Sequence, residues 1–331
     1  MSSVNLRFLA DTGVQVSALA LGTMTFGGAA DAKTSRAIFD RCREAGINLF
    51  DCANVYENGL SEEILGDLVA DCRDEVLVTS KAFFPTGADP NAQGASRRHL
   101  RQAVEGSLRR LHTDRIDLYF IHRFDGKTGL EETLRALDDL VSEGKILYTA
   151  ASNFAAWQVE KALGISALRG FVRFKALQPM YNLVKRQAEV EILPMAEAEN
   201  LAVFPYSPLG GGLLTGKYGG GEQPQDGRLV ESEMYQIRYR DTYDTAERFA
   251  EFARERGWEP AALAVAWVGS HPAVTAPLIG ARNLEQLEGS LAALEIDVTP
   301  ELRAEISALS PEPPPATDRN DERSESGWLA R

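Results

Sequence analysis

Short apolar segments alternate with longer amphipathic segments along most of the chain. The apolar segments have the length of buried strands, and they cover Ala18–Gly22, Ile47–Asp51, Val76–Lys81, Ile116–His122, Ile146–Ser152, Lys175–Gln178, Ala202–Tyr206 and Thr275–Gly280. In the segments between them, apolar residues recur every three or four positions, which is typical of helices with one buried face. This pattern predicts helices over Thr34–Ala45, Ser61–Ala70, Arg97–Leu111, Leu130–Ser142, Ala155–Leu163, Ala188–Glu199, Thr245–Arg256 and Leu284–Leu294.

Eight alternating strand–helix units with continuous apolar strands predict a parallel sheet that closes into an α/β fold, the (β/α)8 TIM barrel. An open doubly wound sheet is the main alternative. It is disfavoured because the G-x-G-x-x-G sequence expected after its first strand is replaced by Thr-Met-Thr-Phe-Gly-Gly. Three segments are additional to the eight strand–helix units of the barrel: a hairpin over Leu6–Val16, a long Gly-rich connection over Gly210–Tyr243, and an extension over Thr299–Arg331 that ends in a polar tail. We predict one domain over residues 1–331, with a mobile tail from about residue 312.

Composition and charge limit the classes of molecule that the protein is expected to bind. The 331 residues include 35 Lys and Arg against 48 Asp and Glu, a formal net charge of −13, which argues against nucleic acid and anionic membranes as partners. The first residues lack the apolar core of a secretory signal, and no C-x-x-C pair occurs among Cys42, Cys52 and Cys72. We therefore expect free thiols and a cytoplasmic location. The four scattered histidines have no metal-ligand spacing, so no metal site is expected.

Reactive side chains end several predicted strands, and in a barrel these ends meet at the active-site face. Asp51, Lys81 and His122 end the second, third and fourth strands, and Tyr56 follows Asp51 in a loop. An ammonium beside a phenol favours the phenolate, so Lys81, held by Asp51, is expected to lower the pKa of Tyr56 from its usual value of about 10. Tyr56 could then protonate a developing alkoxide while His122 orients the carbonyl oxygen. A reduction at this site would need a cofactor as hydride donor.

Each of these residues alone is better explained structurally, as a cap, a packing ring or a solvated ammonium. Their occurrence together on consecutive strand ends favours chemistry. The run Ile47–Gly66, INLFDCANVYENGLSEEILG, also resembles the aldo-keto reductase signature, in which Asp and Tyr are separated by four residues. Further similar segments follow in order up to about Leu294: VTSK ending at Lys81, IHRFD around His122, ASNF at Ser152–Asn153, QPMYN at Gln178–Asn182 and YSPLGGGLLTGK at Tyr206–Lys217.

The resemblance, to the branch that includes the potassium-channel beta subunits, implies a barrel that reduces carbonyls with NADPH. In that family's terms Tyr56 would donate the proton, Asp51 and Lys81 would tune it, and His122 would orient the carbonyl. The cofactor-binding residues that the resemblance implies are Gly22, Thr23, Met24, Ser152, Asn153, Gln178, Tyr206, Ser207, Pro208, Leu209, Gly210, Gly212, Lys217, Arg228, Gly280, Arg282 and Gln286.

Within that set, Ser152, Asn153 and Gln178 would hydrogen-bond the nicotinamide carboxamide and Tyr206 would stack on the ring. The segment Gly211–Lys217 would wrap the pyrophosphate, with Gly219–Gly221 as the hinge of a closing loop. The segment Gly211–Lys217 also resembles a P-loop. Tyr218, however, occupies the position at which a P-loop has the Ser or Thr that binds Mg²⁺, so nucleotide hydrolysis is disfavoured.

At the adenosine end, the family has a basic residue that neutralises the 2′-phosphate of NADPH, and the resemblance implies this role for Arg282, whose guanidinium can bind a phosphate in bidentate fashion. Gln286 would lie near the adenosine. The chain carries Gly289–Ser290 where relatives commonly have Glu-Asn, so NADH stays an alternative cofactor.

Three functions stay open: a carbonyl reductase, a Schiff-base lyase with Lys81 as nucleophile, and a non-catalytic NADPH-sensing subunit. The substrate would be a small carbonyl compound bound in a partly apolar pocket. The candidates for the wall of this pocket are the loop residues Met24–Phe26, Phe83–Phe84, Phe124 and Gly219–Tyr243. The sequence makes no prediction of the oligomeric state.

Overall fold

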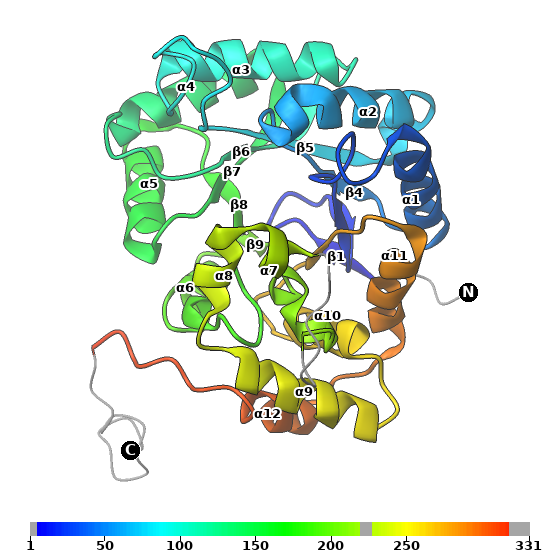
Figure 1. Ribbon diagram of the computed structural model, residues 1–331. Helices are drawn as coiled ribbons and strands as arrows, with labels where there is room; N and C mark the ends of the chain where they lie inside the picture. Colours follow the sequence, from blue (N-terminus) through cyan, green and yellow to red (C-terminus); the bar gives the residue numbers. More distant parts are fainter. Residues whose placement is uncertain (1–4, 219–226, 318–331) are drawn as a thin grey trace.

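A computed structural model describes residues 5–218 and 227–317 and contains one eight-stranded parallel sheet (Figure 1). The strands are β3 (Ala20–Gly22), β4 (Leu49–Asp51), β5 (Leu77–Ala82), β6 (Ile116–Ile121), β7 (Ile146–Ser152), β8 (Phe174–Gln178), β9 (Ala202–Val203) and β10 (Leu278–Ile279), in the order β10-β3-β4-β5-β6-β7-β8-β9. Backbone N–H groups of Thr275 and Ala276 donate to Val203 O, and that of Leu278 donates to Pro205 O. These bonds join the two outer strands, so the predicted TIM barrel is confirmed.

Helices form an outer ring around the strands (Figure 1). They are α1 (Ala32–Glu44), α2 (Leu60–Val69), α3 (Arg97–Arg110), α4 (Leu130–Ser142), α5 (Ala156–Arg169), α6 (Ile192–Ala198), α10 (Pro260–Gly269) and α11 (Leu284–Leu291). The side chains of Asp31, Ser96 and Asn283 cap α1, α3 and α11 by accepting backbone N–H bonds. The predicted helix over Ala155–Leu163 continues to Arg169 and ends where Gly170 adopts a left-handed φ of 69°.

The N-terminal hairpin closes one end of the barrel. Its strands β1 (Leu6–Phe8) and β2 (Gln15–Ser17) pair antiparallel, as predicted. Leu9 and Val16 pack into the interior cluster that contains Ala20 and Leu49, the first residues of β3 and β4. The hairpin therefore fills the amino end of the barrel and leaves the opposite end for the polar strand-end residues.

The long connection after β9 is more structured than a Gly-rich loop. It contains a 3-10 turn (Gly210–Thr215) and the helices α7 (Arg228–Glu231), α8 (Glu233–Tyr239) and α9 (Tyr243–Glu255). The proposed hinge Gly219–Gly221 lies outside the described residues. The predicted long connection over Gly210–Tyr243 is therefore present, and much of the part that the structure describes is helical.

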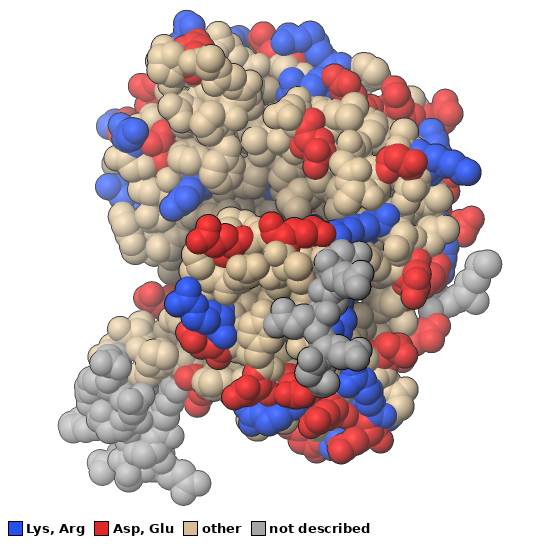
Figure 2. Space-filling view, in the orientation of Figure 1, with Lys and Arg blue, Asp and Glu red and all other residues tan. Residues whose placement is uncertain are grey.

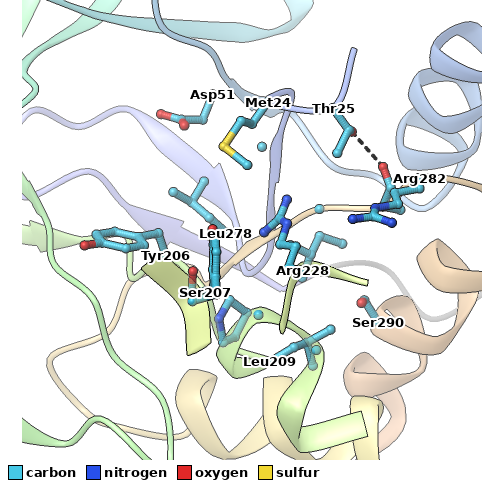
Figure 3. A pocket seen from close by; sticks show the side chains of 18 of the residues that line it. Met24, Thr25, Asp51, Tyr206, Ser207, Leu209, Arg228, Leu278, Arg282 and Ser290 are labelled. Atoms are coloured by element: carbon cyan, nitrogen blue, oxygen red, sulfur yellow. Dashed lines mark hydrogen bonds between the residues drawn. The ribbon is translucent and has the colours of Figure 1, made fainter. Parts of the chain in front are cut away.

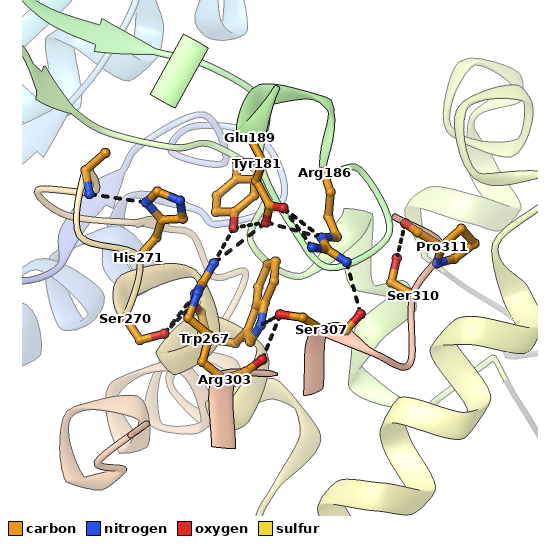
Figure 4. Close-up of polar contacts among 11 residues, drawn as sticks. Tyr181, Arg186, Glu189, Trp267, Ser270, His271, Arg303, Ser307, Ser310 and Pro311 are labelled. Carbon is orange, nitrogen blue, oxygen red and sulfur yellow. Dashed lines mark hydrogen bonds and ion pairs between the residues drawn. The ribbon is translucent and has the colours of Figure 1, made fainter. Parts of the chain in front are cut away.

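The predicted C-terminal extension contains the helix α12 (Pro300–Ser307), which is docked on the barrel and ends before the predicted start of the tail at about residue 312. The Arg303 guanidinium donates to Tyr181 Oη at 2.7 Å and to Trp267 O at 2.6 Å (Figure 4). Arg186 donates to Ser307 O at 3.0 Å from the other side. These bonds fasten α12 to α10 and to the loop after β8. Residues 318–331 of the predicted tail lie outside the described residues.

The helices and the cysteines were also compared with the sequence predictions. Within residues 5–218 and 227–317 no helix is long and apolar enough to cross a membrane. Cys42 and Cys52 are buried and Cys72 is half-buried, all as free thiols, as predicted. Burial raises the pKa of the Cys52 thiol to about 12, so this neighbour of Asp51 is a packed, unreactive side chain.

Candidate active site

A cavity of about 1050 Å³ opens at the carboxyl end of the barrel. Figure 2 shows it as a groove across this face of the molecule. Figure 3 shows Asp51 and Tyr206 at one end of the cavity, Arg228 between, and Arg282 and Ser290 at the other end. The site is therefore elongated, with the strand-end residues gathered at one end and basic residues toward the other.

Asp51 and Lys81 form a buried ion pair below the first end of the cavity. Lys81 Nζ lies 2.5 Å from Asp51 Oδ2 and 2.8 Å from Cys52 O. Thr79 Oγ1 and Gln178 Nε2 donate to Asp51 Oδ1 at 2.6 Å and 2.9 Å. Burial lowers the pKa of Lys81. The Asp51 carboxylate and Tyr56 raise it, and their combined effect is larger than that of burial, so the pKa lies above its usual value. Lys81 is therefore a fixed ammonium.

Tyr56 stands beside this ammonium, with its ring centroid 5.1 Å from Lys81 Nζ. Desolvation of the phenol raises its pKa to about 12, although Lys81 acts in the opposite direction. The prediction that Lys81 brings the pKa of Tyr56 below 10 is thus wrong: the attraction exists, but the low-dielectric surroundings that strengthen it penalise the phenolate more. At neutral pH the phenol keeps its proton.

His122 faces Tyr56 and Phe84 edge-on, with ring centroids 6.0 Å and 4.9 Å away. Desolvation, with a smaller contribution from Lys81, lowers the pKa of His122 to about 3. The imidazole is therefore neutral. Its Nδ1 is buried with no hydrogen-bond partner among the described residues. A proton on Nε2 leaves only a lone pair at that buried position, which favours the Nε2–H tautomer.

Asn153 links the ends of β6, β7 and the loop after β9. Its Nδ2 donates to His122 O at 2.9 Å, and its Oδ1 accepts from Tyr206 Oη at 2.7 Å. Asn153 and Ser207 adopt left-handed φ angles of 56° and 57°. Residues other than glycine are strained in this region of backbone conformation, and such residues are often found at functional sites. The local backbone is thus shaped to present amide and hydroxyl groups to the cavity.

Basic residues line the cavity although the whole chain carries a net charge of −13. Five arginine and lysine residues contribute to its wall, against two carboxylates, one of which is Asp51 in its pair with Lys81. The five are Arg123, Lys217, Arg228, Arg238 and Arg282. At the far end, Arg282 lies 3.4 Å from Glu231, and its backbone N–H donates to Gln286 Oε1. The cavity is therefore suited to an elongated anion.

Comparison with known proteins decides the family, because the aldo/keto reductase family model matches residues 18–311. The chain belongs to the aldo/keto reductase family. It is 37% identical to the uncharacterized oxidoreductase YrpG of Bacillus subtilis, with 92% of this chain and 96% of that protein aligned. It is 36% identical to a probable voltage-gated potassium channel subunit beta of Oryza sativa (94% and 98% aligned) and 34% to the norsolorinic acid reductase stcV of Emericella nidulans (90% and 79% aligned). The family and these relatives make it an oxidoreductase.

In this aldo/keto reductase, most residues predicted for the site line the cavity, and three do not. Thr23 is buried, with its Oγ1 donating to Asp51 O and 3.0 Å from Ser61 Oγ, so it supports β4 instead of facing a ligand. Lys81 and Gly210 lie behind the wall. Of the aromatic residues in the segments expected near the substrate, Phe84 and Tyr235 line the cavity, whereas Phe26, Phe83 and Phe124 do not.

The cavity residues of this aldo/keto reductase that the sequence did not single out include one after β6 and two on α8. Arg123 follows His122 directly, and Tyr235 and Arg238 lie on α8. The signal for Arg123 was its position after a strand-end residue. Tyr235 and Arg238 fall within the segment Gly219–Tyr243 that was expected near the substrate, but the sequence did not single them out, because the direction of α8 over the cavity depends on the packing of the connection. No group of three His, Cys, Asp or Glu side chains suited to a metal occurs among residues 5–218 and 227–317.

Proposed function

We propose that this chain reduces an aldehyde or ketone to the alcohol with NADPH, and that Tyr56 supplies the proton. The observation that carries the proposal is the buried Lys81–Asp51 pair, with its ammonium 5.1 Å from the Tyr56 ring centroid at the floor of an elongated, cation-lined cavity.

The donor set supports a nicotinamide dinucleotide. Amide and hydroxyl groups of Ser152, Asn153 and Gln178 suit a carboxamide, and the Tyr206 ring suits a flat heterocycle. Toward the other end, Lys217, Arg228 and Arg282 suit phosphates. Between them, Gly211 and Gly212 have φ angles of 70° and 97°, so the wall there is backbone that can approach a pyrophosphate closely. NADPH, when bound, supplies hydride to the carbonyl carbon.

Tyr56 is suited to donate the proton because it is neutral over the physiological range and touches the cavity. As it gives up its proton to the developing alkoxide, negative charge appears on the phenolic oxygen next to the Lys81 ammonium. In a desolvated site that attraction is strong and requires no rearrangement. Asp51 cannot move toward Tyr56, because Thr79, Gln178 and Lys81 hold its carboxylate.

His122 is suited to orient the carbonyl oxygen. Its neutral imidazole, with the proton on Nε2, donates a hydrogen bond to an oxygen without adding a full charge. Phe84 packs edge-on against the ring and limits its rotation. The carbonyl oxygen would thus lie between a Tyr56 hydroxyl and a His122 N–H.

A Schiff-base reaction at Lys81 is disfavoured by two observations. The ammonium is completely buried and does not line the cavity, and its pKa lies above the usual value. A Schiff base requires a neutral, accessible amine. Borohydride trapping with an aldehyde substrate should therefore leave Lys81 unmodified.

A non-catalytic, NADPH-sensing function is the second candidate, favoured by the similarity to proteins named as potassium channel beta subunits. The test is NADPH consumption with a panel of neutral aldehydes and ketones, alongside NADPH binding by fluorescence titration. Turnover that depends on the aldehyde supports the reductase. Tight NADPH binding without turnover on any member of the panel would replace it with the sensing function.

A further inference from the structure

Two of the five cavity cations lie near Tyr206, and the proposed NADPH site does not use them. Arg123 follows His122 at the end of β6, and Arg238 lies on α8. Both charges act on the Tyr206 phenol, lowering its pKa against the larger, opposite effect of burial. Asn153 ties Tyr206 to the backbone of His122, and Arg123 follows His122 directly, so the Tyr206 side of the cavity adjoins the proposed catalytic residues.

Arg123 and Arg238 differ from Arg282 in their ion pairing. Among the described residues, no carboxylate lies within ion-pair distance of Arg123 or Arg238, whereas Arg282 pairs with Glu231. The contact of Arg238 is with the face of Tyr235, 5.1 Å from the ring centroid, and this leaves its N–H groups available. Arg123 is exposed at the rim. Two guanidinium groups that line one cavity and have no carboxylate partner among residues 5–218 and 227–317 favour an oxyanion.

Apolar side chains also line the cavity near the proposed catalytic residues. Phe84 lies 4.9 Å from the His122 ring, Val55 precedes Tyr56, and Met24 lies beside Asp51 (Figure 3). A substrate that fills this space would have its carbonyl at Tyr56 and His122, an apolar body against these side chains, and its remaining end at the arginines. The rim therefore selects for negative charge at that end.

We propose that Arg123 and Arg238 bind a carboxylate of the substrate, so that the physiological substrates are aldehydes or ketones carrying an acid group. The inference rests on the proposed function and adds to it the substrate class. Each charge-assisted hydrogen bond to a carboxylate corresponds to about a tenfold gain in kcat/KM or more.

The test uses two aldehydes of similar size that differ in charge, 4-carboxybenzaldehyde and methyl 4-formylbenzoate, each with saturating NADPH. The wild-type protein should have about a 100-fold higher kcat/KM for the acid, about tenfold for each arginine. Arg123→Gln and Arg238→Gln should each lower the acid-to-ester ratio about tenfold, and the double variant should bring it near one. Arg240→Gln, which removes an exposed arginine at the end of α8 outside the cavity wall, should leave the ratio unchanged.

A second measurement needs no variant. Because the rim is open to solvent, added NaCl should lower the acid-to-ester ratio of the wild-type protein. Equal kcat/KM for the two aldehydes, or a preference that survives in the double variant, would overturn the inference while leaving the reductase intact. Variants that weaken NADPH binding without changing the ratio would also overturn it, because the arginines would then belong to the cofactor site. No turnover of either aldehyde would overturn the proposed function and this inference together.

Discussion

Lys81 holds its ammonium 2.5 Å from the Asp51 carboxylate, and both side chains are almost completely shielded from water. A buried pair of this kind contributes little net stability, because desolvation of both ions offsets their attraction. Its benefit here is positional: it keeps a positive charge beside the Tyr56 ring. The pair is thus better explained by the chemistry of the cavity than by folding.

This distinction can be measured with Lys81→Met and the double variant Asp51→Asn/Lys81→Met. The single variant leaves a buried carboxylate uncompensated and should lower the free energy of unfolding by about 3–5 kcal/mol. The double variant removes both charges and should regain much of that loss in urea unfolding, while carbonyl reduction stays abolished. Recovery of activity together with stability would show that the pair acts only in folding.

Arg282→Ala should weaken NADPH binding by about 10–100-fold and NADH binding far less, because it removes a guanidinium suited to the 2′-phosphate. Glu231→Gln is the matched control. It releases Arg282 from its 3.4 Å ion pair and should leave NADPH binding equal or tighter. Fluorescence titration of both cofactors gives the comparison. Equal losses for NADPH and NADH would exclude recognition of the 2′-phosphate at Arg282.

The pKa values of the two proposed catalytic residues define the pH dependence. His122, with its pKa lowered to about 3, gains a proton only as the pH falls toward that value. Tyr56, with its pKa raised to about 12, loses the proton it donates only as the pH rises toward 12. The kcat/KM for a neutral aldehyde should therefore be flat from about pH 5 to about pH 9. A loss of activity below pH 6.5 that disappears in His122→Asn would show that the imidazole titrates normally.

Arg303→Met tests the docking of α12. Its guanidinium donates hydrogen bonds to Tyr181 and to Trp267 O at the junction of three segments, so its loss should destabilise the protein by about 2–3 kcal/mol in urea unfolding. Arg256→Met removes an exposed pair with Glu305 of α12 and should cost about 0.5 kcal/mol or less. Similar effects of the two variants would mean that the buried network does not fasten α12.

The barrel and the first end of its site could be predicted from the sequence, because both follow from strand periodicity. Asp51, Ser152 and Gln178 end β4, β7 and β8 as the apolar runs indicated, and parallel strands bring such residues to one face. The helix α10, by contrast, is apolar almost all round, so it has no amphipathic pattern to detect. The start of α12 carried a signal that was missed, a Thr299 cap followed by Pro300.

What could not be predicted depends on three-dimensional burial. The sequence correctly placed a cation beside Tyr56, but the sign of the net pKa shift depends on how much water the folded site excludes. The approach of α8 to Tyr206, which gives Arg238 its place at the cavity, likewise depends on the packing of a long connection.

Proton donation by Tyr56 is tested most directly with the Tyr56→Phe variant, which removes one hydroxyl and keeps the ring. We predict that NADPH binding, measured by fluorescence titration, stays within about twofold of the wild-type protein. Reduction of a neutral aldehyde should fall by about 100-fold or more, the usual contribution of a general acid. Full activity with unchanged NADPH binding would show that another group donates the proton.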